Sequence, residues 1–274
     1  MSKQVNLHFE CSPAGETFLA RRFVTYPFFF TAPFRLDRVP AGMLTAILQS
    51  VSGGIYNREQ LALSFTAGQN AHVHCTTQSA TVVHSMANGE EASQLVTIHA
   101  ARGSFVEYLP DALILFPEAC LRTTLHVVIE EGATVILSDA FLTHDPKAQG
   151  RSFRSLSSET VVQNVNGQRL CIDRFVITGE ELRLASVGYC AQGTMWILNV
   201  QQSGDLLPAL RKRLEPVLGI YAGVSTLPHN AGVWVRILAI DGVALHKGLH
   251  AAWAAARSVL TGEEPQSRRK TGWT

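Results

Sequence analysis

Charge is scarce in this sequence. Asp, Glu, Lys and Arg make up 16% of the 274 residues, against about 25% in an average globular protein, and the formal net charge is +1. Because the charges balance, the chain lacks the basic surface that nucleic-acid binding requires, and we expect no nucleic-acid partner. A small solvated surface also favours a protein that is partly covered by other chains.

Closely spaced cysteines are absent as well. No two of the five form a CxxC or CxxxC pair, and an odd number cannot pair completely. This pattern argues against a disulfide framework and for a reducing compartment. The first ten residues, MSKQVNLHFE, contain no apolar core of a secretory signal, so we expect a cytoplasmic protein. The five are Cys11, Cys75, Cys120, Cys171 and Cys190.

The sequence has no apolar run long enough to span a membrane. Its most apolar window is FVTYPFFFTAPFRL at residues 23–36, where Pro27 and Pro33 interrupt the run. A spanning helix needs about 20 apolar residues. We therefore expect no membrane contact.

Signatures of nucleotide binding and of serine catalysis are missing. The chain contains no GxxxxGKS, GxxxxGKT or GxGxxG, so ATP, GTP and dinucleotides are not expected ligands. Ser225 lies in GVSTL, which lacks the second glycine of a nucleophile elbow and does not join a strand to a helix. We expect no catalytic residue of this kind.

What the chain does have is period-two alternation. Short runs rich in Val, Ile, Leu and Thr are separated by turn formers such as Arg102-Gly103 and Glu131-Gly132. Turns about 8–12 residues apart predict strands joined by hairpins in an all-β architecture. Asn166-Gly167 in VNGQRL fits a two-residue type I′ turn. The predicted strands span 61–66, 71–76, 94–99, 124–129, 133–138, 169–177 and 233–240.

Two segments in the C-terminal third have helical periodicity. Asp205 can cap a helix over 206–219, with Pro208 near its start. The run at 245–261 keeps its large apolar residues on one face and ends at Gly262. We therefore expect a mainly β fold with two α-helices.

No linker or low-complexity segment divides the chain. We expect a single domain over 1–274, with an ordered core at roughly 15–262. The tail at 263–274, with its basic cluster Arg268-Arg269-Lys270, is expected to be loose because termini usually are.

The stretch HVHCTTQSATVVH at 72–84 concentrates possible metal ligands. In a strand, His72 and His74 share one face, while Cys75 lies on the other face beside Val73. Two histidines at this spacing can bind one ion, but a tight site needs a third or fourth ligand, which the sequence does not place. Ordinary strand residues are the alternative interpretation, and Cys75 then packs as a small apolar residue.

Three carboxylates lie inside apolar runs. Glu107 occurs in SFVEYLP, Asp139 follows TVILS, and Asp173 occurs in LCIDRF. A buried acid is costly unless it is paired or hydrogen-bonded. These residues are either paired or edge acids, or they mark a polar path for a cation through the β-rich body.

The order of several short motifs resembles the family of the urease accessory protein UreD, also called UreH. The likeness runs from about Thr17 to about Gly262, nearly the whole chain. The motifs that carry it are SGG (52–54), TTQSAT (76–81), EYLP (107–110), ILF (114–116), FRSLSSETVVQNVNGQRLCIDRF (153–175), GVSTL (223–227), WVR (234–236) and the final Ala-rich helix.

The resemblance implies a maturation scaffold and not an enzyme. Members of this family bind the urease apoprotein and a second accessory protein, UreF, and through UreF they recruit the GTPase UreG. The implied fold is a solenoid-like winding of many short strands with two α-helices. Ni²⁺ is expected to pass through the protein in transit, with no stably bound cofactor, and the chain is expected to work in a hetero-oligomer.

By position, the resemblance implies five candidates for the nickel path. Isolated carboxylates and hydroxyls attract a divalent ion without trapping it, as a full His/Cys cage would. The candidates are Glu59, Thr77, Ser79, Asp139 and Asp173.

The chain also departs from the family pattern. Asn57, Arg58 and Glu59 replace two glycines and an Asp, and glycines at these positions would permit a positive φ. The segment THDP at 143–146 also differs from the family pattern. Such departures are expected of a divergent member of the family or of a member that works with different partners.

Two other function classes stay open from the sequence. One is a metal-dependent enzyme on a β-scaffold that uses His72 and His74 with a distal acid. The other is a β-rich interaction module without a metal role.

Overall fold

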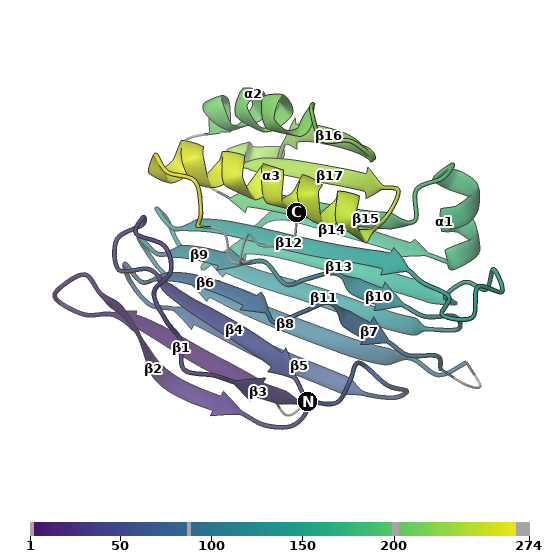
Figure 1. The fold of residues 1–274 in the computed structure, drawn as a ribbon. Coiled ribbons are helices and arrows are strands. Elements are labelled where there is room, and N and C mark those ends of the chain that lie inside the picture. Colours follow the sequence, from purple (N-terminus) through teal and green to yellow (C-terminus); the bar gives the residue numbers. More distant parts are fainter. Residues whose placement is uncertain (1–2, 87–88, 199–202, 267–274) are drawn as a thin grey trace.

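The computed structural model describes residues 3–86, 89–198 and 203–266, which form two packed β-sheets and three α-helices (Figure 1). The predicted mainly β fold is confirmed. Sheet A contains, in spatial order, β14 (Arg169–Ile177), β13 (Ser155–Asn164), β11 (Cys120–Ile129), β8 (Ala92–Ala100), β5 (Gln60–Ala67), β1 (Val5–Cys11) and β2 (Thr17–Val24).

Sheet B has ten strands, which lie across from sheet A. Its main order is β16 (Ile220–Thr226), β17 (Val233–Ala239), β15 (Ala191–Leu198), β12 (Thr134–Thr143), β9 (Phe105–Tyr108), β6 (His72–Thr77), β4 (Leu44–Ser50) and β3 (Phe28–Phe30). The two short strands β10 (Leu113–Leu115) and β7 (Thr81–Val83) pair with each other, and β10 also pairs with β12.

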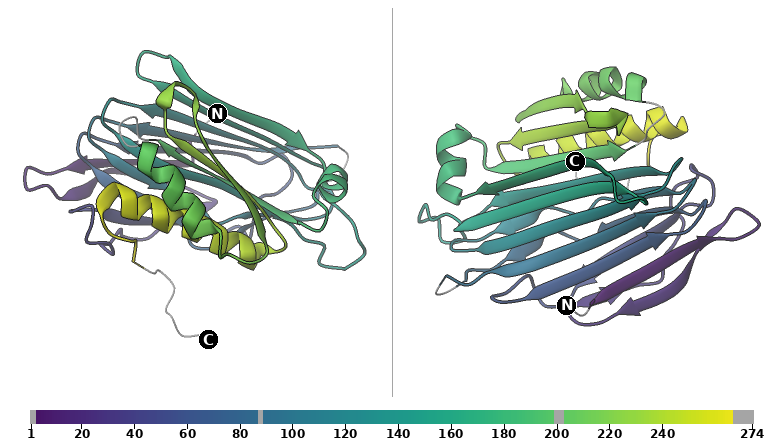
Figure 2. Two further views of the ribbon diagram at one scale, coloured as in Figure 1. Left: turned by 90° about the horizontal axis from the view of Figure 1, so that it is seen from above. Right: turned by 180° about the vertical axis from the view of Figure 1, so that it is seen from behind.

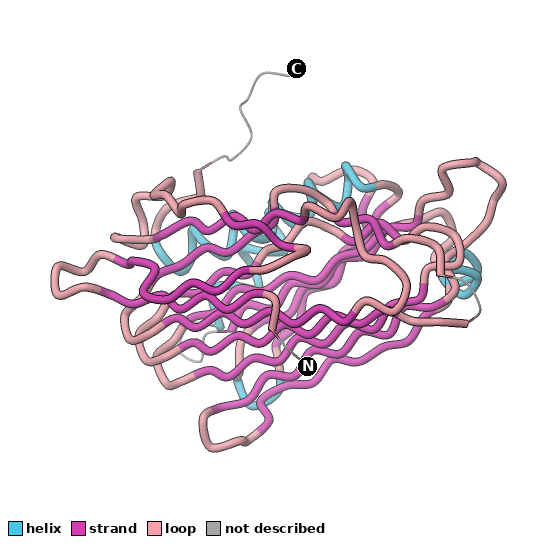
Figure 3. The backbone as a smooth tube through the Cα atoms, turned by 90° about the horizontal axis from the view of Figure 1, so that it is seen from below, coloured by secondary structure: helices cyan, strands magenta, loops and turns pink. Residues whose placement is uncertain are grey.

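The chain winds between the two sheets like a solenoid. Strands β5, β8, β11 and β13 are parallel neighbours in sheet A, and strands β4, β6, β9 and β12 are parallel neighbours in sheet B. Figure 2 shows the strands of sheet A side by side from behind, and Figure 3 shows both sheets from below with the helices beyond them. The winding implied by the family resemblance is therefore confirmed.

The predicted hairpins at Arg102-Gly103 and Glu131-Gly132 are wrong. These turns join β8 to β9 and β11 to β12, so each carries the chain from sheet A to sheet B. These two turns stack with the turn at Asn70, which joins β5 to β6. Asn70 N–H donates to the Arg102 carbonyl at 3.0 Å, and Arg102 N–H donates to Glu130 Oε2 at 2.9 Å. Short turns rich in Gly and Asn are common to hairpins and to solenoid corners, so the sequence alone does not separate them.

The turn at VNGQRL is a hairpin, but not of the predicted two-residue type. A type I′ turn needs two residues with positive φ. Here Gly167 has a φ of 78°, whereas the φ of Asn166 is not positive. The Gly167 N–H donates to the Asn164 carbonyl at 3.0 Å, and the register of β13 and β14 shifts nearby. The loop is therefore a longer turn closed by a left-handed glycine.

Two hydrophobic cores result from this arrangement. The larger core lies between the sheets, and the second lies between the outer face of sheet B and the helices α2 (Ser203–Leu214) and α3 (Gly242–Thr261). On β1, Val5, Leu7 and Phe9 are fully buried in the larger core. The core thus extends further toward the N-terminus than residue 15.

The helices differ in part from the predictions. α3 is confirmed: Asp241 caps it by accepting from Ala244 N–H, and Gly262 ends it with φ 83°. α2 starts before Asp205 and ends at Leu214. It ends there because Glu215 precedes Pro216, and a residue before proline is disfavoured in the helical conformation. α1 (Gly179–Ala185) was not predicted, although Thr178 and Glu181 form a capping box.

Residues 267–274, including the basic cluster Arg268-Arg269-Lys270, lie outside the described residues. Among the residues that are described, no helix is long and apolar enough to cross a membrane. All five cysteines are described, and no disulfide joins any two of them.

Candidate functional site

Sheet B is interrupted where three neighbouring chain segments stop pairing. β12 pairs with β9 up to Leu137 and with β10 from Phe141, so Ser138, Asp139 and Ala140 have no partner on that side. The segments facing this break are 109–112, between β9 and β10, and 78–80, between β6 and β7. At the break, the backbone hydrogen bonds that would connect β12 to β6 through the strands between them are therefore interrupted.

A cavity lies between the two sheets on the inner side of this break. Its volume is about 220 Å³, and its lining includes Thr77 and Ser79 beside the break, Asp139 on β12 and Ser158 on β13. Apolar side chains of the larger core and further polar side chains share the remaining wall. Three of the five predicted candidates, Thr77, Ser79 and Asp139, thus line one cavity.

Asp139 is one of two carboxylates in the lining of this cavity, and the other is Asp111. Ser158 Oγ donates a hydrogen bond to Asp139 Oδ2 at 2.8 Å, which links the two sheets. Burial raises the pKa of Asp139, and nearby Asp173 raises it further, while the Ser158 hydrogen bond and Arg236 act in the opposite direction. The net result is a carboxyl with increased proton affinity in a confined space whose wall is partly polar and partly apolar.

Asp173 lies next to this cavity but is held by a different partner. Arg236 Nη2 on β17 donates to Asp173 Oδ2 on β14 at 2.5 Å, so this ion pair also joins the two sheets. The Arg236 guanidinium additionally lies over the Trp234 ring, 4.5 Å from its centroid. Asp173 acts on Asp139 electrostatically and is neutralised by Arg236.

Glu59 is not brought to this cavity. Its Oε2 accepts from Tyr56 N–H at 2.9 Å, which closes the turn before β5. In the same turn Arg58 has φ 62° and forms an ion pair with Glu90. The loop therefore takes the left-handed conformation that glycines would permit, although a bulky residue stands there.

The stretch HVHCTT alternates as predicted. Cys75 and Val73 are buried in the core between the sheets, whereas His74 lies on the outer face of sheet B. His72 shares that outer face, and its Nδ1 lies 2.9 Å from the Ala41 carbonyl oxygen. The ring of His72 therefore contacts Ala41, whereas the ring of His74 contacts Glu107.

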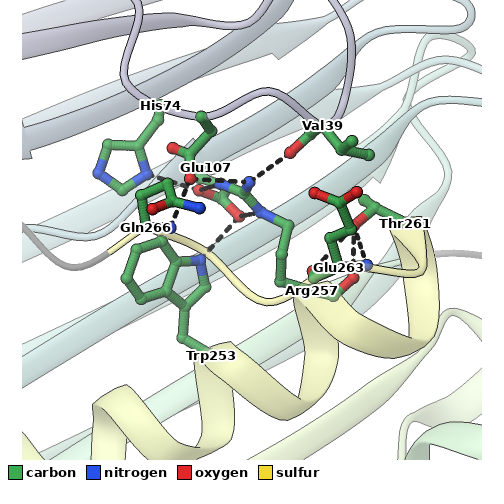
Figure 4. Close-up of polar contacts among 9 residues, drawn as sticks. Val39, His74, Glu107, Trp253, Arg257, Thr261, Glu263 and Gln266 are labelled. Carbon is green, nitrogen blue, oxygen red and sulfur yellow. Dashed lines mark hydrogen bonds and ion pairs between the residues drawn. The ribbon is translucent and has the colours of Figure 1, made fainter.

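His74 belongs to a buried ion cluster beneath α3 (Figure 4). Its Nδ1 lies 2.5 Å from Glu107 Oε2, and Arg257 holds both oxygens of Glu107 at 2.7 Å each. Trp253 Nε1 donates to Glu107 Oε1 at 2.7 Å. Burial alone would raise the pKa of Glu107, but the hydrogen bonds from His74 and Arg257 outweigh it and lower the pKa to about 2.

This cluster fastens the C-terminal helix to the solenoid. Arg257 also donates to the Val39 carbonyl at 2.8 Å and lies 3.5 Å from Asp37, whose Oδ1 accepts from Gln266 N–H at 2.8 Å. Glu107 is therefore a paired acid, and its role is structural. Sequence reasoning missed Arg257, although its position four residues after Trp253 on an apolar helix face was a signal.

A second and larger cavity lies outside sheet B, against α3. Its volume is about 760 Å³, and it shares the segment 76–80 and Ser138 with the cavity between the sheets. The two cavities therefore adjoin at the break in sheet B. From α3, the exposed His246 and His250 line this outer cavity. Neither histidine was among the predicted candidates, although the spacing HKGLH was a signal.

The arrangement can attract a cation but does not form a closed cage. Among residues 3–86, 89–198 and 203–266, no group of three or more His, Cys, Asp or Glu side chains is placed to hold a metal ion. His74, buried against Glu107, is not arranged with His72 as a shared ligand pair. The metal-dependent enzyme that uses His72 and His74 thus gains no support from the geometry.

The chain is a β-scaffold protein: it is a two-sheet solenoid with a polar break in sheet B and a C-terminal helix attached to that sheet. The model of the UreD urease accessory protein family matches residues 2–271. The urease accessory protein UreD 1 of Pseudomonas syringae pv. syringae (strain B728a) is 39% identical over 98% of this chain and 95% of its own length.

Other relatives agree with this result. The urease accessory protein UreD 1 of Pseudomonas syringae pv. tomato (strain ATCC BAA-871 / DC3000) is 39% identical over 97% of this chain and 94% of its own length. UreD 1 of Methylorubrum populi is 35% identical over 93% of this chain and 88% of its own length. The chain belongs to the UreD family of urease accessory proteins. It is an accessory protein with a role in urease maturation, and it is not an enzyme.

Proposed function

We propose that this protein passes Ni²⁺ toward apo-urease through the cavity between its sheets. The observation that carries the proposal is the position of Asp139, Thr77 and Ser79 around one cavity at the break in sheet B. Glu59 is left out of the proposed path because the structure places it in the turn before β5. Asp173 is included only through its electrostatic effect on Asp139.

The chemistry of this cavity suits an ion that moves on. Hydroxyls and the two carboxylates of Asp139 and Asp111 are hard, weak ligands for nickel, whereas several imidazoles or thiolates would hold it tightly. Asp139 supplies carboxyl oxygens for the ion, and Ser158 orients this carboxyl by a hydrogen bond of 2.8 Å. The ion is cargo of the protein and not its cofactor.

The proposed partners are apo-urease and a UreF-like protein, which would bring a UreG-like GTPase. Large apolar side chains that stay exposed on the isolated chain support a protein that works in a hetero-oligomer. The proposed compartment is the cytoplasm, which fits five cysteines without a disulfide. The exposed side chains include Phe23, Tyr26, Phe29, Leu218, Tyr221 and Val243.

The test is nickel activation of urease in a host that lacks its own copy of this gene. The gene is returned as the natural form, as Asp139→Asn, or as Glu59→Gln. We expect Asp139→Asn to lower urease activity severely at every nickel concentration, while apo-urease stays abundant. Glu59→Gln is the matched control, because it neutralises a carboxylate outside the cavity.

Co-purification separates transport from assembly. We expect the Asp139→Asn protein to bind the UreF-like protein and apo-urease as the natural form does, because Asp139 lies inside the scaffold. Full activation by Asp139→Asn would rule out the proposed nickel path and favour a β-rich interaction module without a metal role.

A further inference from the structure

The face of α3 that lines the outer cavity carries two histidines one helical turn apart. His246 and His250 are exposed, and their ring centroids are 6.3 Å apart with an angle of 25° between the ring planes. Two histidines at i and i+4 on a helix can bind the same transition-metal ion. α3 is anchored at Arg257, so the pair is presented by a fixed element and not by a loop.

The surroundings connect this pair to the break in sheet B. The same outer cavity is lined by the segment 76–80 and Ser138, which also line the cavity that contains Asp139. Its charged lining residues are Asp111 and Lys247, one of each sign, so no charge excess repels a cation. An ion held at α3 would thus face the polar break directly.

We propose that His246 and His250 form a two-imidazole site for a borderline divalent transition metal at the outer entrance of the break. Imidazole suits nickel, copper and zinc, whereas Mg²⁺ and Ca²⁺ prefer oxygen ligands. With only two protein ligands, the remaining positions are left to water or to a partner's side chain, so the ion can leave. This inference rests on the proposed nickel path for its biological meaning, but the binding site itself does not.

Binding is tested on the purified full chain without a polyhistidine tag. Calorimetric titration with NiCl₂ compares the natural protein, His246→Gln/His250→Gln, and the control His8→Gln/His126→Gln. The control removes the same number of imidazoles from β1 and β11, which are separated by β5 and β8 in sheet A. Thermal unfolding without metal checks that all three proteins are folded.

We expect the α3 double variant to bind nickel at least about tenfold more weakly, because disturbing even the groups that orient a ligand costs about 10–100-fold in affinity. The control should bind as the natural protein does. Nickel should also raise the unfolding temperature of the natural protein and of the control, but not of the α3 double variant. Equal nickel affinity in all three proteins would overturn the inference.

A second measurement separates this inference from the proposed function. In the urease activation assay, the α3 double variant should need more nickel for half-maximal activity and recover at high nickel, whereas Asp139→Asn should not recover. If Asp139→Asn activates urease fully while nickel binding still depends on His246 and His250, the path is refuted and the site stands. If nickel binding does not depend on them, the site is refuted whatever Asp139→Asn does.

Discussion

Arg257 on α3 and Glu107 on β9 form a bidentate ion pair across 150 positions of the chain, and both side chains are fully buried. Both Arg257–Glu107 hydrogen bonds measure 2.7 Å, and His74 and Trp253 complete the coordination of the carboxylate. A buried pair does not by itself add stability over an apolar replacement, but removal of one partner leaves an uncompensated buried charge.

The first prediction concerns this pair. Arg257→Met should lower the free energy of unfolding by about 3–5 kcal/mol, because Glu107 stays buried without the guanidinium that holds both of its oxygens. Urea unfolding at neutral pH measures the change. Arg122→Met is the matched control: Arg122 pairs with Glu91 on the surface, with side-chain exposures of 58% and 36%. That substitution should cost less than about 1 kcal/mol. Similar costs for the two substitutions would contradict a special role of the buried pair.

The second prediction concerns acid stability. The pKa of Glu107 is lowered from 4.5 to about 2 in the folded protein, so its contribution to stability is present above pH 4.5 and is lost as the pH falls toward 2. Glu107→Gln cannot titrate. The variant should be less stable than the natural protein at pH 7, and its stability should change less between pH 5 and pH 3. Unfolding curves collected over this range check both statements, and parallel pH profiles of the two proteins would contradict them.

Asp139 behaves in the opposite way, which gives the third prediction. Its pKa is raised in the folded protein, so folding is most favourable below the unfolded value of 3.8 and loses stability as the pH rises through the folded pKa. Asp139→Asn keeps an oxygen that can accept from Ser158 but carries no charge.

We therefore expect Asp139→Asn to be more stable than the natural protein at pH 7, because the natural protein must either bury the charge or hold a proton that the unfolded chain has released. The gain should vanish below pH 4. Ser158→Ala is the control, because it removes the hydrogen bond and leaves the charge, and it should destabilise the protein. A gain in stability together with a loss of urease activation would show that the acid is kept for function.

The sequence predicts the strands well because alternation is a local property. The runs at 61–66, 94–99 and 124–129 lie within β5, β8 and β11, and VWVRILAI coincides with β17 apart from its last residue. Which strands pair is not local. The turns at Gly103 and Gly132 fit hairpins by composition, and only the family resemblance indicated that they cross between sheets.

The candidate site was predicted only in part, because it too depends on strand pairing that is not local in the sequence. Thr77 and Ser79 come from the end of β6 and the residues after it, and Asp139 comes from β12. They meet only because the β6–β7 and β9–β10 segments are interrupted at the same level of the solenoid, beside the continuous β12. Nothing in the sequence around Arg257 indicates that its partner is Glu107, since that contact depends on how α3 lies across sheet B. Glu59 matched a family position, yet its side chain caps a turn instead.

The last prediction concerns Gly54, which stands in the SGG motif and lines the cavity between the sheets. Its φ is 146°, and a Cβ added there would lie 2.4 Å from the Val82 carbonyl oxygen and 2.9 Å from His84 Nε2. That carbonyl already accepts from Ile55 N–H at 2.8 Å, so the backbone cannot move away without breaking the contact of Ile55 with β7.

Gly54→Ala should therefore cost more than about 2 kcal/mol of unfolding free energy, from backbone strain and from the lost Ile55 contact together. Gly167→Ala is the matched control: φ is 78°, and nothing lies within 4 Å of the added Cβ. It should cost about 1–2 kcal/mol from strain alone. Urea unfolding of both variants decides the matter. An equal cost would mean that the close approach of Gly54 to Val82 adds nothing, and that the SGG motif serves the turn alone and not the wall of the cavity.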